Sequence, residues 1–328
     1  MKATAPKTRI GIIGVGRMGE YHLRKILALA SVETVGFFEA NAQRAAKLST
    51  DYGCTAFTSI EDLLFECDAV IIASPTELHF AHVHAALEQG VHVLVEKPMA
   101  STVAEAEKLV ELARARQLVL QVGMVERYRL AKLAQSIPLG RIRFLETHRL
   151  TPQLPRDKDI DVVSDLMIHD LDLALSLAHM DPVHISAVGI RVLTGNPDVA
   201  NVRLEFPDGA VMNLNASRVS GEPLRRLRVF AENAYASFDF QLNTATWASG
   251  GVGQAIEKHA VEQRQVDPLL EQAEHFEHCV RSGQPPLVSG VDGLRALRIA
   301  EQVLAKIRER ESLAQTTARS PHPVLEGP

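Results

Sequence analysis

From residue 9 to residue 123 the chain alternates short apolar runs, rich in β-branched residues, with longer stretches of helical periodicity. One helix start is explicit, because Thr102 and Glu105 have capping-box spacing ahead of an apolar face. Such alternation is typical of parallel strands joined by crossover helices, so we expect an α/β, doubly wound Rossmann sheet here. The expected strands are RIGIIG, ETVGFFE, DAVIIA, HVLVEK and LVLQVG.

The pattern changes after residue 123, where strands follow one another in succession. Two segments have hairpin character, because alternating runs flank an Asp-Gly turn in one and Glu-Asn-Ala in the other. The second part is therefore expected to be α+β with a mostly antiparallel sheet. The expected elements are helices over 130–136, 163–178, 268–281 and 291–308, a strand over 141–150, and hairpins in FPDGAVMNL and RRLRVFAENAYASFDF.

The length and the composition suit two domains. The chain has 328 residues and a hydrophobic content of 46%, enough to bury two cores. We expect a first domain over residues 1–123 and a second domain over residues 124–311. Residues 312–328 contain three prolines among scattered Ser and Thr, which predicts a poorly ordered tail.

Charge and cysteine content exclude several classes of protein. Lys and Arg total 35 against 40 Asp and Glu, a formal net charge of −5, so no global positive field favours nucleic acid or an anionic membrane as a partner. No run approaches the roughly 20 apolar residues that span a bilayer, and the N-terminal apolar run reads as a strand rather than a signal peptide. Cys54, Cys67 and Cys279 lack CxxC spacing, which argues against a disulfide framework or a zinc cluster and predicts a cytoplasmic location.

A glycine fingerprint follows the first expected strand. Gly14, Gly16 and Gly19 form G-x-G-x-x-G, with Arg17 and Met18 at the start of the next helix. The first glycine permits a tight turn, the second lets the backbone approach a pyrophosphate, and the third allows close packing of helix on strand. The helix N-terminus adds free N–H groups and a positive dipole end. These residues are expected to bind a dinucleotide.

Residues at the ends of the next strands extend this expected site. Glu39 ends the second strand, where a carboxylate can accept hydrogen bonds from the ribose hydroxyls and repel a 2′-phosphate, so NAD is favoured over NADP. Ser74 and Pro75 follow the third strand and are expected to line the cofactor site, with His79 just beyond them. The neighbouring His82 and His84 are interpreted as residues of a surface helix.

Two segments combine ionisable residues with apolar surroundings. Glu96 and Lys97 end the fourth expected strand, and both are expected to line the cofactor site. There the lysine could donate to a substrate oxygen beside the nicotinamide; the alternative is a loop lysine paired with Glu96. In the helix over 163–178, Asp165, His169 and Asp172 share one face. An imidazole is suited to accept a hydroxyl proton near neutral pH, and a carboxylate one turn away can fix its tautomer. Asp165, His169 and Asp172 could in principle bind a divalent metal ion, but this face has no second histidine at ligand spacing, so no metal is expected.

The order and spacing of these motifs resemble the Gfo/Idh/MocA oxidoreductases over nearly the whole chain. The resemblance implies an NAD-binding Rossmann domain over residues 1–123 and a substrate-binding and oligomerisation domain over residues 124–311. The open sheet of the second domain would mediate assembly as a homodimer or homotetramer. The implied activity is NAD(P)-dependent oxidation of sugar or polyol hydroxyls. It also implies that Lys97, Asp165 and His169 form the catalytic triad and contact the substrate. The motifs are Gly14-x-Gly16-x-x-Gly19, Ser74-Pro75-Thr76, Glu96-Lys97-Pro98, Asp165-x-x-x-His169, PLLEQAEHFEHCV and VSGVDGLRALRIAE.

The chain also departs from the common family pattern, with Thr76-Glu77 in place of an Asn and Val162-Val163-Ser164 in place of a glycine-rich lead. The segments VGMVERYR and DVVSDLMIHDLDL are similar instead to a subgroup of nucleotide-sugar dehydrogenases, the UDP-N-acetylglucosamine 3-dehydrogenases of lipid A assembly. A UDP group calls for cationic and aromatic ligands. The candidates, each equally well an ordinary surface residue, are Arg127, Tyr128, Arg149 and Arg156.

The sequence therefore predicts an NAD-dependent dehydrogenase acting on CH–OH groups, with oxidation of UDP-N-acetylglucosamine to its 3-keto form as the expected reaction. The alternatives are a dehydrogenase of a free sugar or polyol, a non-catalytic dinucleotide-sensing protein on the same fold, and a dehydratase or hydrolase that uses NAD transiently.

Overall fold

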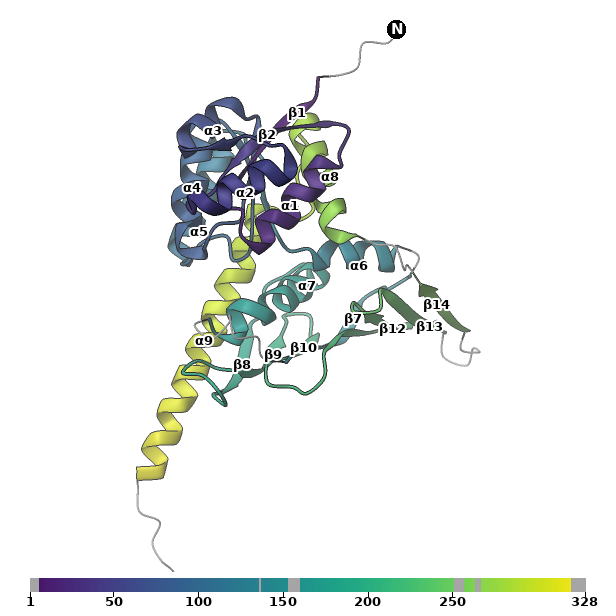
Figure 1. Cartoon of the computed structure of the whole chain (residues 1–328). Helices are drawn as coiled ribbons and strands as arrows, with labels where there is room; N and C mark the ends of the chain where they lie inside the picture. The colour runs from purple at the N-terminus through teal and green to yellow at the C-terminus, as the bar shows by residue number, and fades with distance from the viewer. Residues whose placement is uncertain (1–5, 136, 153–159, 251–256, 263–266, 320–328) are drawn as a thin grey trace, which may run out of the picture. The chain divides into compact units, whose positions relative to one another are not determined.

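The computed structural model describes residues 6–135, 137–152, 160–250, 257–262 and 267–319, and these fall into two compact units. The first unit comprises residues 1–136 and 261–297, and the second comprises residues 137–260 and 298–328 (Figure 1). Each unit has its own sheet and its own buried core.

A six-stranded parallel sheet forms the centre of the first unit. Its strand order is β3-β2-β1-β4-β5-β6, the order of a doubly wound dinucleotide-binding sheet. The winding reverses between β1 and β4, which places the loops after these strands where such sheets bind their ligands. The strands are β1 (Thr8–Ile13), β2 (Val32–Phe38), β3 (Ala56–Phe57), β4 (Ala69–Ile72), β5 (His92–Val95) and β6 (Leu120–Val122).

Helices cover this sheet, and several begin at side-chain caps. Asn41, Ser59, Thr102 and Asp267 each accept a hydrogen bond from the backbone N–H three residues later. Thr102 also forms the predicted capping box with Glu105. The helices are α1 (Arg17–Leu27), α2 (Ala42–Tyr52), α3 (Ile60–Glu66), α4 (Thr76–Glu88), α5 (Val103–Ala115), α6 (Glu126–Ala134) and α8 (Pro268–Ser282).

The core of the first unit joins residues far apart in the sequence. Ile12 of β1, Ile71 of β4 and Leu23 of α1 are fully buried, and so is Phe276 of α8. Helix α8 lies beside α1 (Figure 1), and its Glu277 accepts a hydrogen bond from the hydroxyl of Thr8 at 3.1 Å. A late segment of the chain therefore completes the first unit.

The second unit is built on an eight-stranded sheet in the order β14-β13-β12-β11-β7-β10-β9-β8. Strands β7 and β10 are parallel, whereas the other pairs with a defined register are antiparallel. Both predicted hairpins are present, as β9–β10 and β11–β12. The strands are β7 (Ile142–Leu150), β8 (His184–Ile190), β9 (Val199–Glu205), β10 (Val211–Ser217), β11 (Leu224–Ala231), β12 (Ala234–Asp239), β13 (Thr244–Ser249) and β14 (Glu257–Glu262).

One helical segment packs on this sheet. It begins as the π-helix η1 (Val163–Met167) and continues as α7 (Ile168–Ala178), which contacts β7 and β10 (Figure 1). The helix α9 (Gly290–Arg319) belongs to the first unit over residues 290–297 and to the second from residue 298. None of the helices in the described ranges is long and apolar enough to cross a bilayer.

The predicted fold class is confirmed, since a parallel Rossmann sheet is followed by a mostly antiparallel one. The details differ in several places. The helix expected over residues 130–136 begins earlier, at Glu126, as α6. The short β3 and helix α3 were not predicted. Residues 124–136 and 261–297 belong to the first unit, whereas the sequence placed them in the second. Helix α9 continues to Arg319, so its last turns occupy the start of the expected tail.

Candidate active-site residues

The turn between β1 and α1 has the geometry that the glycine fingerprint requires. Gly14 has a φ of +83°, and a Cβ there would lie 2.7 Å from the backbone of Ser74. At Gly19 a Cβ would lie 2.0 Å from the carbonyl oxygen of Gly14. Both positions exclude any larger residue, because the obstructing atoms belong to the backbone. The turn and the first helix are therefore held tightly against β1 and β4.

Gly16 differs from the other two glycines, because a Cβ at this position would meet no atom within 4 Å. It is the N-cap of α1, and it has no side chain to satisfy the first N–H groups of the helix. The open space and the exposed helix end form a cradle in which a phosphate can approach the backbone. The chain therefore fits a dinucleotide at this turn.

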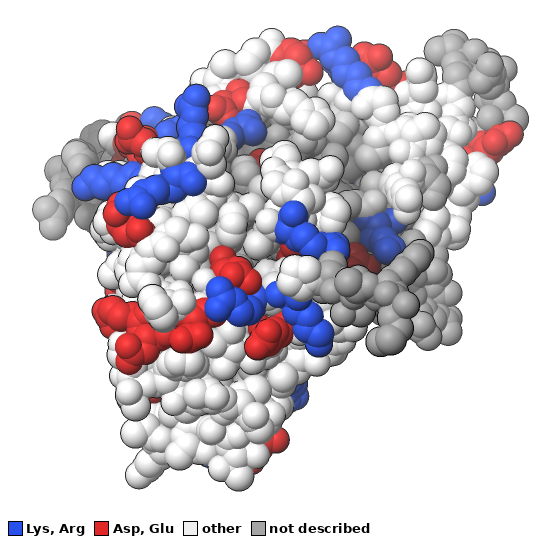
Figure 2. All heavy atoms as spheres, turned by 90° about the horizontal axis from the view of Figure 1, so that it is seen from above, with Lys and Arg blue, Asp and Glu red and all other residues white. Residues whose placement is uncertain are grey.

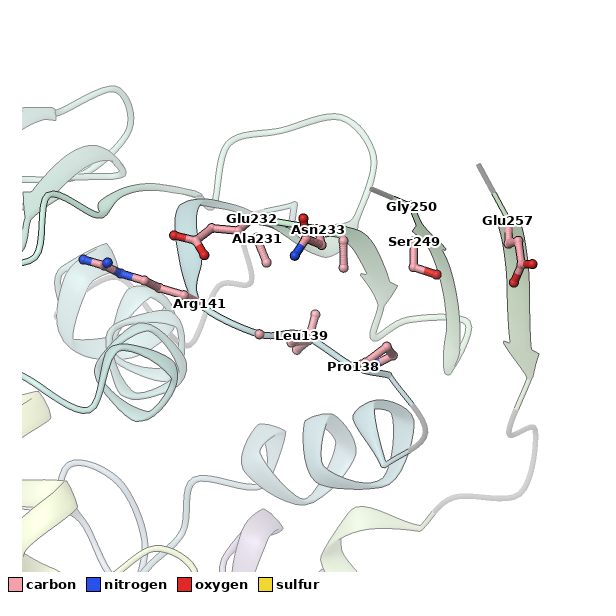
Figure 3. Close-up of a pocket in the computed structure, with 11 residues that line it drawn as sticks. Pro138, Leu139, Arg141, Ala231, Glu232, Asn233, Ser249, Gly250 and Glu257 are labelled. Carbon is pink, nitrogen blue, oxygen red and sulfur yellow. The ribbon is translucent and has the colours of Figure 1, made fainter. Parts of the chain in front are cut away.

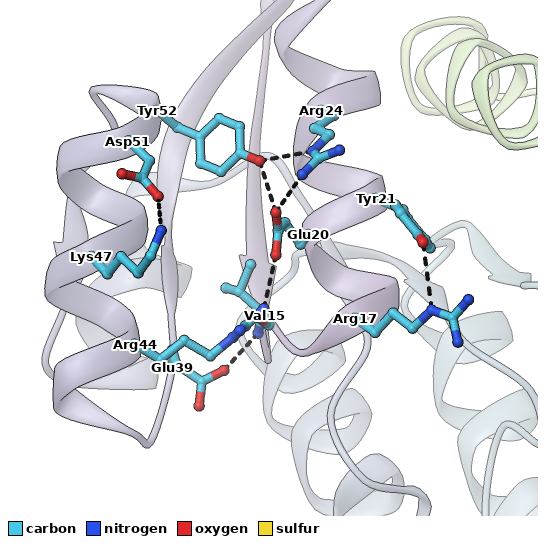
Figure 4. Close-up of polar contacts among 10 residues, drawn as sticks. All are labelled: Val15, Arg17, Glu20, Tyr21, Arg24, Glu39, Arg44, Lys47, Asp51 and Tyr52. Atoms are coloured by element: carbon cyan, nitrogen blue, oxygen red, sulfur yellow. Dashed lines mark hydrogen bonds and ion pairs between the residues drawn. The ribbon is translucent and has the colours of Figure 1, made fainter. Parts of the chain in front are cut away.

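The carboxylate of Glu39 lies at this turn, as Figure 4 shows. One of its oxygens accepts the backbone N–H of Val15 at 2.9 Å, and the other accepts that of Asn41 at 3.0 Å. Arg44 donates to the carbonyl oxygen of Val15 at 2.6 Å and to Glu20 at 2.9 Å. The guanidinium of Arg44 is thus bound by Glu20 and by the Val15 carbonyl. The carboxylate of Glu39 lies just after β2.

The two residues that follow Gly16 differ in surroundings. Arg17 donates to the Tyr21 hydroxyl at 3.4 Å, and its guanidinium lies 5.9 Å from the centre of that ring. Met18 is 39% exposed. Both residues are exposed at the surface of the first helical turn.

The loop after β4 is tied to the loop after β5. Pro75 is the N-cap of α4, and the Ser74 hydroxyl lies 3.0 Å from Nδ1 of His82. His79 is buried, and its ring nitrogens lie 2.8 Å from the carbonyl oxygens of Ser74 and Pro98. His79, for which the sequence left the choice open, therefore links the two loops.

Lys97 lies half-buried at the end of β5, and the Lys97–Pro98 peptide bond is cis. The neighbouring Glu96 is 8% exposed, and its carboxylate faces His22 of α1 at 2.8 Å. Burial alone would raise the pKa of Glu96, but the hydrogen bond and charge of His22, together with the charge and backbone N–H of Lys97, hold this pKa below its usual range. Glu96 is therefore an ionised group turned toward the protein interior.

In the second unit, Asp165 lies on η1 and His169 on the first turn of α7. Both residues are half-buried, whereas Asp172 is only 1% exposed. Asp172 thus differs from the other two in burial, because it lies within the buried stretch of α7. The π-helical start changes the spacing of side chains relative to an α-helix, a feature that recurs at functional sites.

The four residues predicted to bind a UDP group fall into different places. Arg149 is 4% exposed, and its guanidinium donates to both carboxylate oxygens of Asp170 at 2.9–3.2 Å. Such a buried, bidentate pair accounts for Arg149 without a ligand. Arg156 lies outside the described residues.

The other two candidates, Arg127 and Tyr128, are on α6 in the first unit. Arg127 donates to Asp292 at 3.1 Å, and its side chain is 12% exposed. Tyr128 is 5% exposed, and its hydroxyl lies 3.3 Å from Nδ1 of His275. These contacts join α6 to later segments of the same unit, so both side chains help to hold that unit together.

Two groups of buried polar residues were not predicted from the sequence. His22 pairs with Glu96 in the first unit, and Asp198 accepts from Arg218 at 2.9 Å in the second. Asp198 also accepts the backbone N–H groups of residues 192–194, and although burial raises its pKa, these bonds hold the pKa far below its usual range. A helical period of three to four places His22 on the inner face of α1, which was the available signal.

A surface pocket of the second unit contains none of the predicted site residues. It lies beside the β11–β12 turn, and Figure 3 shows Arg141, Glu232 and Glu257 at its margin. Arg141 donates to the carbonyl oxygen of Asp208 at 3.0 Å. This pocket and the predicted site residues therefore do not coincide.

Charge on the surface is mixed in sign. Figure 2 shows Lys and Arg next to Asp and Glu on the face that it presents. Many charged side chains of the described residues form ion pairs, such as Arg24 with Glu20 at 2.6 Å. This distribution fits the net charge of −5 and a small-molecule ligand better than a polyanion.

Comparison with known proteins gives consistent matches to both units. Residues 8–124 match a family model described as "Oxidoreductase family, NAD-binding Rossmann fold", and residues 128–237 match the "GFO/IDH/MocA C-terminal domain". The UDP-N-acetylglucosamine 3-dehydrogenase of Acidithiobacillus ferrooxidans is 40% identical over 301 residues, covering 90% of this chain and 96% of the relative. A solved structure of that enzyme has a TM-score of 0.88, covering 92% of this chain and 98% of its own. The myo-inositol 2-dehydrogenase of Thermotoga maritima is 26% identical, covering 93% and 98% of the two chains.

Proposed function

Because the chain belongs to the Gfo/Idh/MocA family of oxidoreductases, we propose that it oxidises a secondary hydroxyl of a nucleotide sugar, namely the C3 hydroxyl of UDP-N-acetylglucosamine, with NAD. The observation that carries the substrate is the 40% identity to a UDP-N-acetylglucosamine 3-dehydrogenase over nearly the whole chain. The triad Lys97, Asp165 and His169 supports a catalytic rather than a sensing role, since a binding module has no need of this set.

The residues at the β1–α1 turn support NAD as the cofactor. Bound NAD supplies the acceptor for the hydride. Gly16 leaves room for the pyrophosphate, and Glu39 would repel a 2′-phosphate while accepting ribose hydroxyls. Arg44, a cation that could otherwise attract that phosphate, is engaged by Glu20 and by the Val15 carbonyl. We assign the adjoining positions Arg17, Met18, Ser74 and Pro75 to the same cofactor site.

Three side chains divide the proton chemistry. Oxidation of a secondary alcohol removes the hydroxyl proton as the hydride leaves carbon, and we assign acceptance of that proton to the imidazole of His169. Asp165, one turn earlier in the chain, orients that ring and stabilises its protonated form. The ammonium of Lys97 donates a hydrogen bond to the substrate oxygen and stabilises negative charge as it develops there.

The setting of the reaction follows from the same premise. The three cysteines are buried and free, which suits a reducing compartment such as the cytoplasm. The family resemblance supports a homodimer or homotetramer formed through the eight-stranded sheet. The 3-keto product would serve amino-sugar synthesis of the lipid A type.

A substrate screen tests the proposal. The protein is incubated with NAD or NADP and with UDP-N-acetylglucosamine, other nucleotide sugars, free sugars and myo-inositol, and reduction is followed at the nicotinamide absorbance or through recycling with a 2-oxo acid. We expect turnover with UDP-N-acetylglucosamine and NAD, and a loss of the preference for NAD in Glu39→Ala. Turnover with myo-inositol alone would favour the polyol alternative, which the Thermotoga maritima relative supports. Silence with every substrate would contradict an oxidoreductase of this specificity.

A further inference from the structure

A buried pair of ionisable residues includes Glu96, the residue before Lys97. Nε2 of His22 is 2.8 Å from a carboxylate oxygen of Glu96, and the side chains are 0% and 11% exposed. His22 comes from α1, the helix that begins at the glycine turn, whereas Glu96 directly follows β5. The pair therefore connects the helix of the expected dinucleotide site with the strand end that carries the lysine.

The carboxylate of Glu96 is confined on several sides. Besides His22, the backbone N–H of Lys97 donates to it at 3.3 Å. Gly123, just after β6, leaves room for it, because a Cβ at this position would lie 2.9 Å from a Glu96 oxygen. Each of these contacts restricts the carboxylate to one orientation beside the lysine.

The pair is costly as a purely structural element. Burying a charged carboxylate carries a desolvation penalty that a single partner rarely offsets, and an apolar pair of the same volume would often be as stable. In addition, Nδ1 of His22 is buried without a hydrogen-bond partner among the described residues. The placement of such a costly pair next to the lysine assigned to catalysis points to a role in positioning that lysine.

We propose that His22 and Glu96 position Lys97: the imidazole fixes the Glu96 carboxylate, and the carboxylate fixes the backbone and the ammonium group of the lysine. Neither residue touches the substrate, so both are positioning residues. The inference rests on the proposed function, because Lys97 is the group that acts on the substrate oxygen. The depressed pKa of Glu96 is consistent with this role, because it keeps the carboxylate charged throughout the neutral range.

Matched variants separate positioning from stability. His22→Leu removes the hydrogen bond, His22→Gln keeps a donor, and Glu96→Gln keeps the shape but removes the charge. The control is His92→Leu, the same change at the opposite end of β5, where Nδ1 of His92 accepts the Val119 N–H at 2.9 Å. Lys97→Ala reports the role of the lysine itself.

We expect kcat to fall by about 10- to 100-fold in His22→Leu and Glu96→Gln, with the KM for NAD unchanged, because a misplaced donor affects the transition state more than binding. His22→Gln should recover much of kcat, and His92→Leu should retain it. Equal kcat in His22→Leu and in the wild type, while Lys97→Ala is inactive, would overturn the inference alone. Equal rates in the wild type and Lys97→Ala would instead contradict the proposed function.

A spectroscopic readout does not depend on turnover. The lysines are reductively ¹³C-methylated, and the Lys97 signal is identified by its absence in Lys97→Arg. We expect this signal to change its chemical shift in His22→Leu and Glu96→Gln but not in His92→Leu, in protein that melts cooperatively. An unchanged signal in both variants would show that the pair does not act on Lys97, whatever the substrate.

Discussion

In the first unit the residues assigned to chemistry follow the ends of parallel strands, whereas in the second unit they lie on a helical segment that begins as a π-helix. At the strand ends, topology alone brings Gly14, Ser74 and Lys97 to the same edge of the sheet. On the helix, Asp165 and His169 are neighbours in a stretch where Asp170 and Asp172 are buried. Position on the sheet therefore predicts the candidate site residues of the first unit, whereas in the second unit the residue type alone does not separate candidate site residues from buried ones.

The buried cations sharpen this contrast. Arg149 and Arg218 of the second unit have carboxylate partners at 2.9 Å and are 4% and 2% exposed. In that unit a charged residue can belong to an internal ion pair, so its charge alone does not identify a substrate site. The following variants test the distinction, from the largest expected effect to the smallest.

The largest effect is expected at His169. Replacement of the proton acceptor in His169→Asn should lower kcat by about 10²- to 10⁴-fold, because general-base catalysis contributes on this scale. Binding of NADH, measured by fluorescence, should be unchanged, since the assigned cofactor residues are elsewhere. Equal rates in the variant and the wild type would remove the role assigned to His169.

Arg149 should affect stability rather than turnover. Arg149→Met leaves Asp170 buried without its partner, and breaking such a pair costs about 3–5 kcal/mol of unfolding free energy. Denaturant unfolding measures this loss, and steady-state kinetics on the folded fraction should give an unchanged KM for the nucleotide sugar. A large rise in KM with normal stability would instead make Arg149 a substrate ligand.

Two glycines of one turn should differ in what they affect. Gly16→Ala adds a methyl group in open space, so it should weaken NADH binding by at least about tenfold, or 1.4 kcal/mol, with an unchanged melting temperature. Gly19→Ala would bring a Cβ to 2.0 Å from the Gly14 carbonyl oxygen, so it should lower the melting temperature as well. If both variants behave alike, the turn does not form the cradle described.

The smallest effect is expected at Asp68, on the amino edge of the same sheet. Burial raises the pKa of Asp68, but two hydrogen bonds and the charge of Arg9 hold it below the usual value. The pair is partly exposed, so Asp68→Asn should cost only about 0–1 kcal/mol at pH 7.

The pH dependence of that effect has a definite sign. Because the folded pKa is depressed, the stabilisation by Asp68 is complete above its unfolded pKa of about 3.9 and is lost as the pH falls through the folded value. The difference in melting temperature between Asp68→Asn and the wild type should therefore shrink below about pH 4. A melting-temperature difference that grows on acidification would contradict the ion pair. The affinity for NADH should be the same in Asp68→Asn and in the wild type.

The fold and the enzyme class could be predicted because they depend on local patterns. Strand rhythm, the glycine motif and the Asp-Gly hairpin each act within a few residues, and their order defines the family. What the sequence did not predict depends on distant partners. Arg149 meets Asp170, and Arg127 meets Asp292, at separations of 21 and 165 residues, so neither pair is visible in a local window.

The first compact unit extends beyond the expected first domain for the same reason. Helix α8 is far from α1 in the chain but packs beside it through residues such as Phe276, and an amphipathic pattern does not say which core it joins. The positions assigned to cofactor and substrate remain predictions, which the variants above address.

The central claim is that hydride passes from C3 of a nucleotide sugar to the nicotinamide. The most direct measurement uses UDP-N-acetylglucosamine deuterated at C3, a single turnover with NAD, and mass spectrometry of the nicotinamide product. We predict reduced nicotinamide one mass unit heavier than that from the unlabelled sugar, together with a 3-keto sugar without the label. Deuterium retained in the sugar, or exchanged into water, would contradict the account.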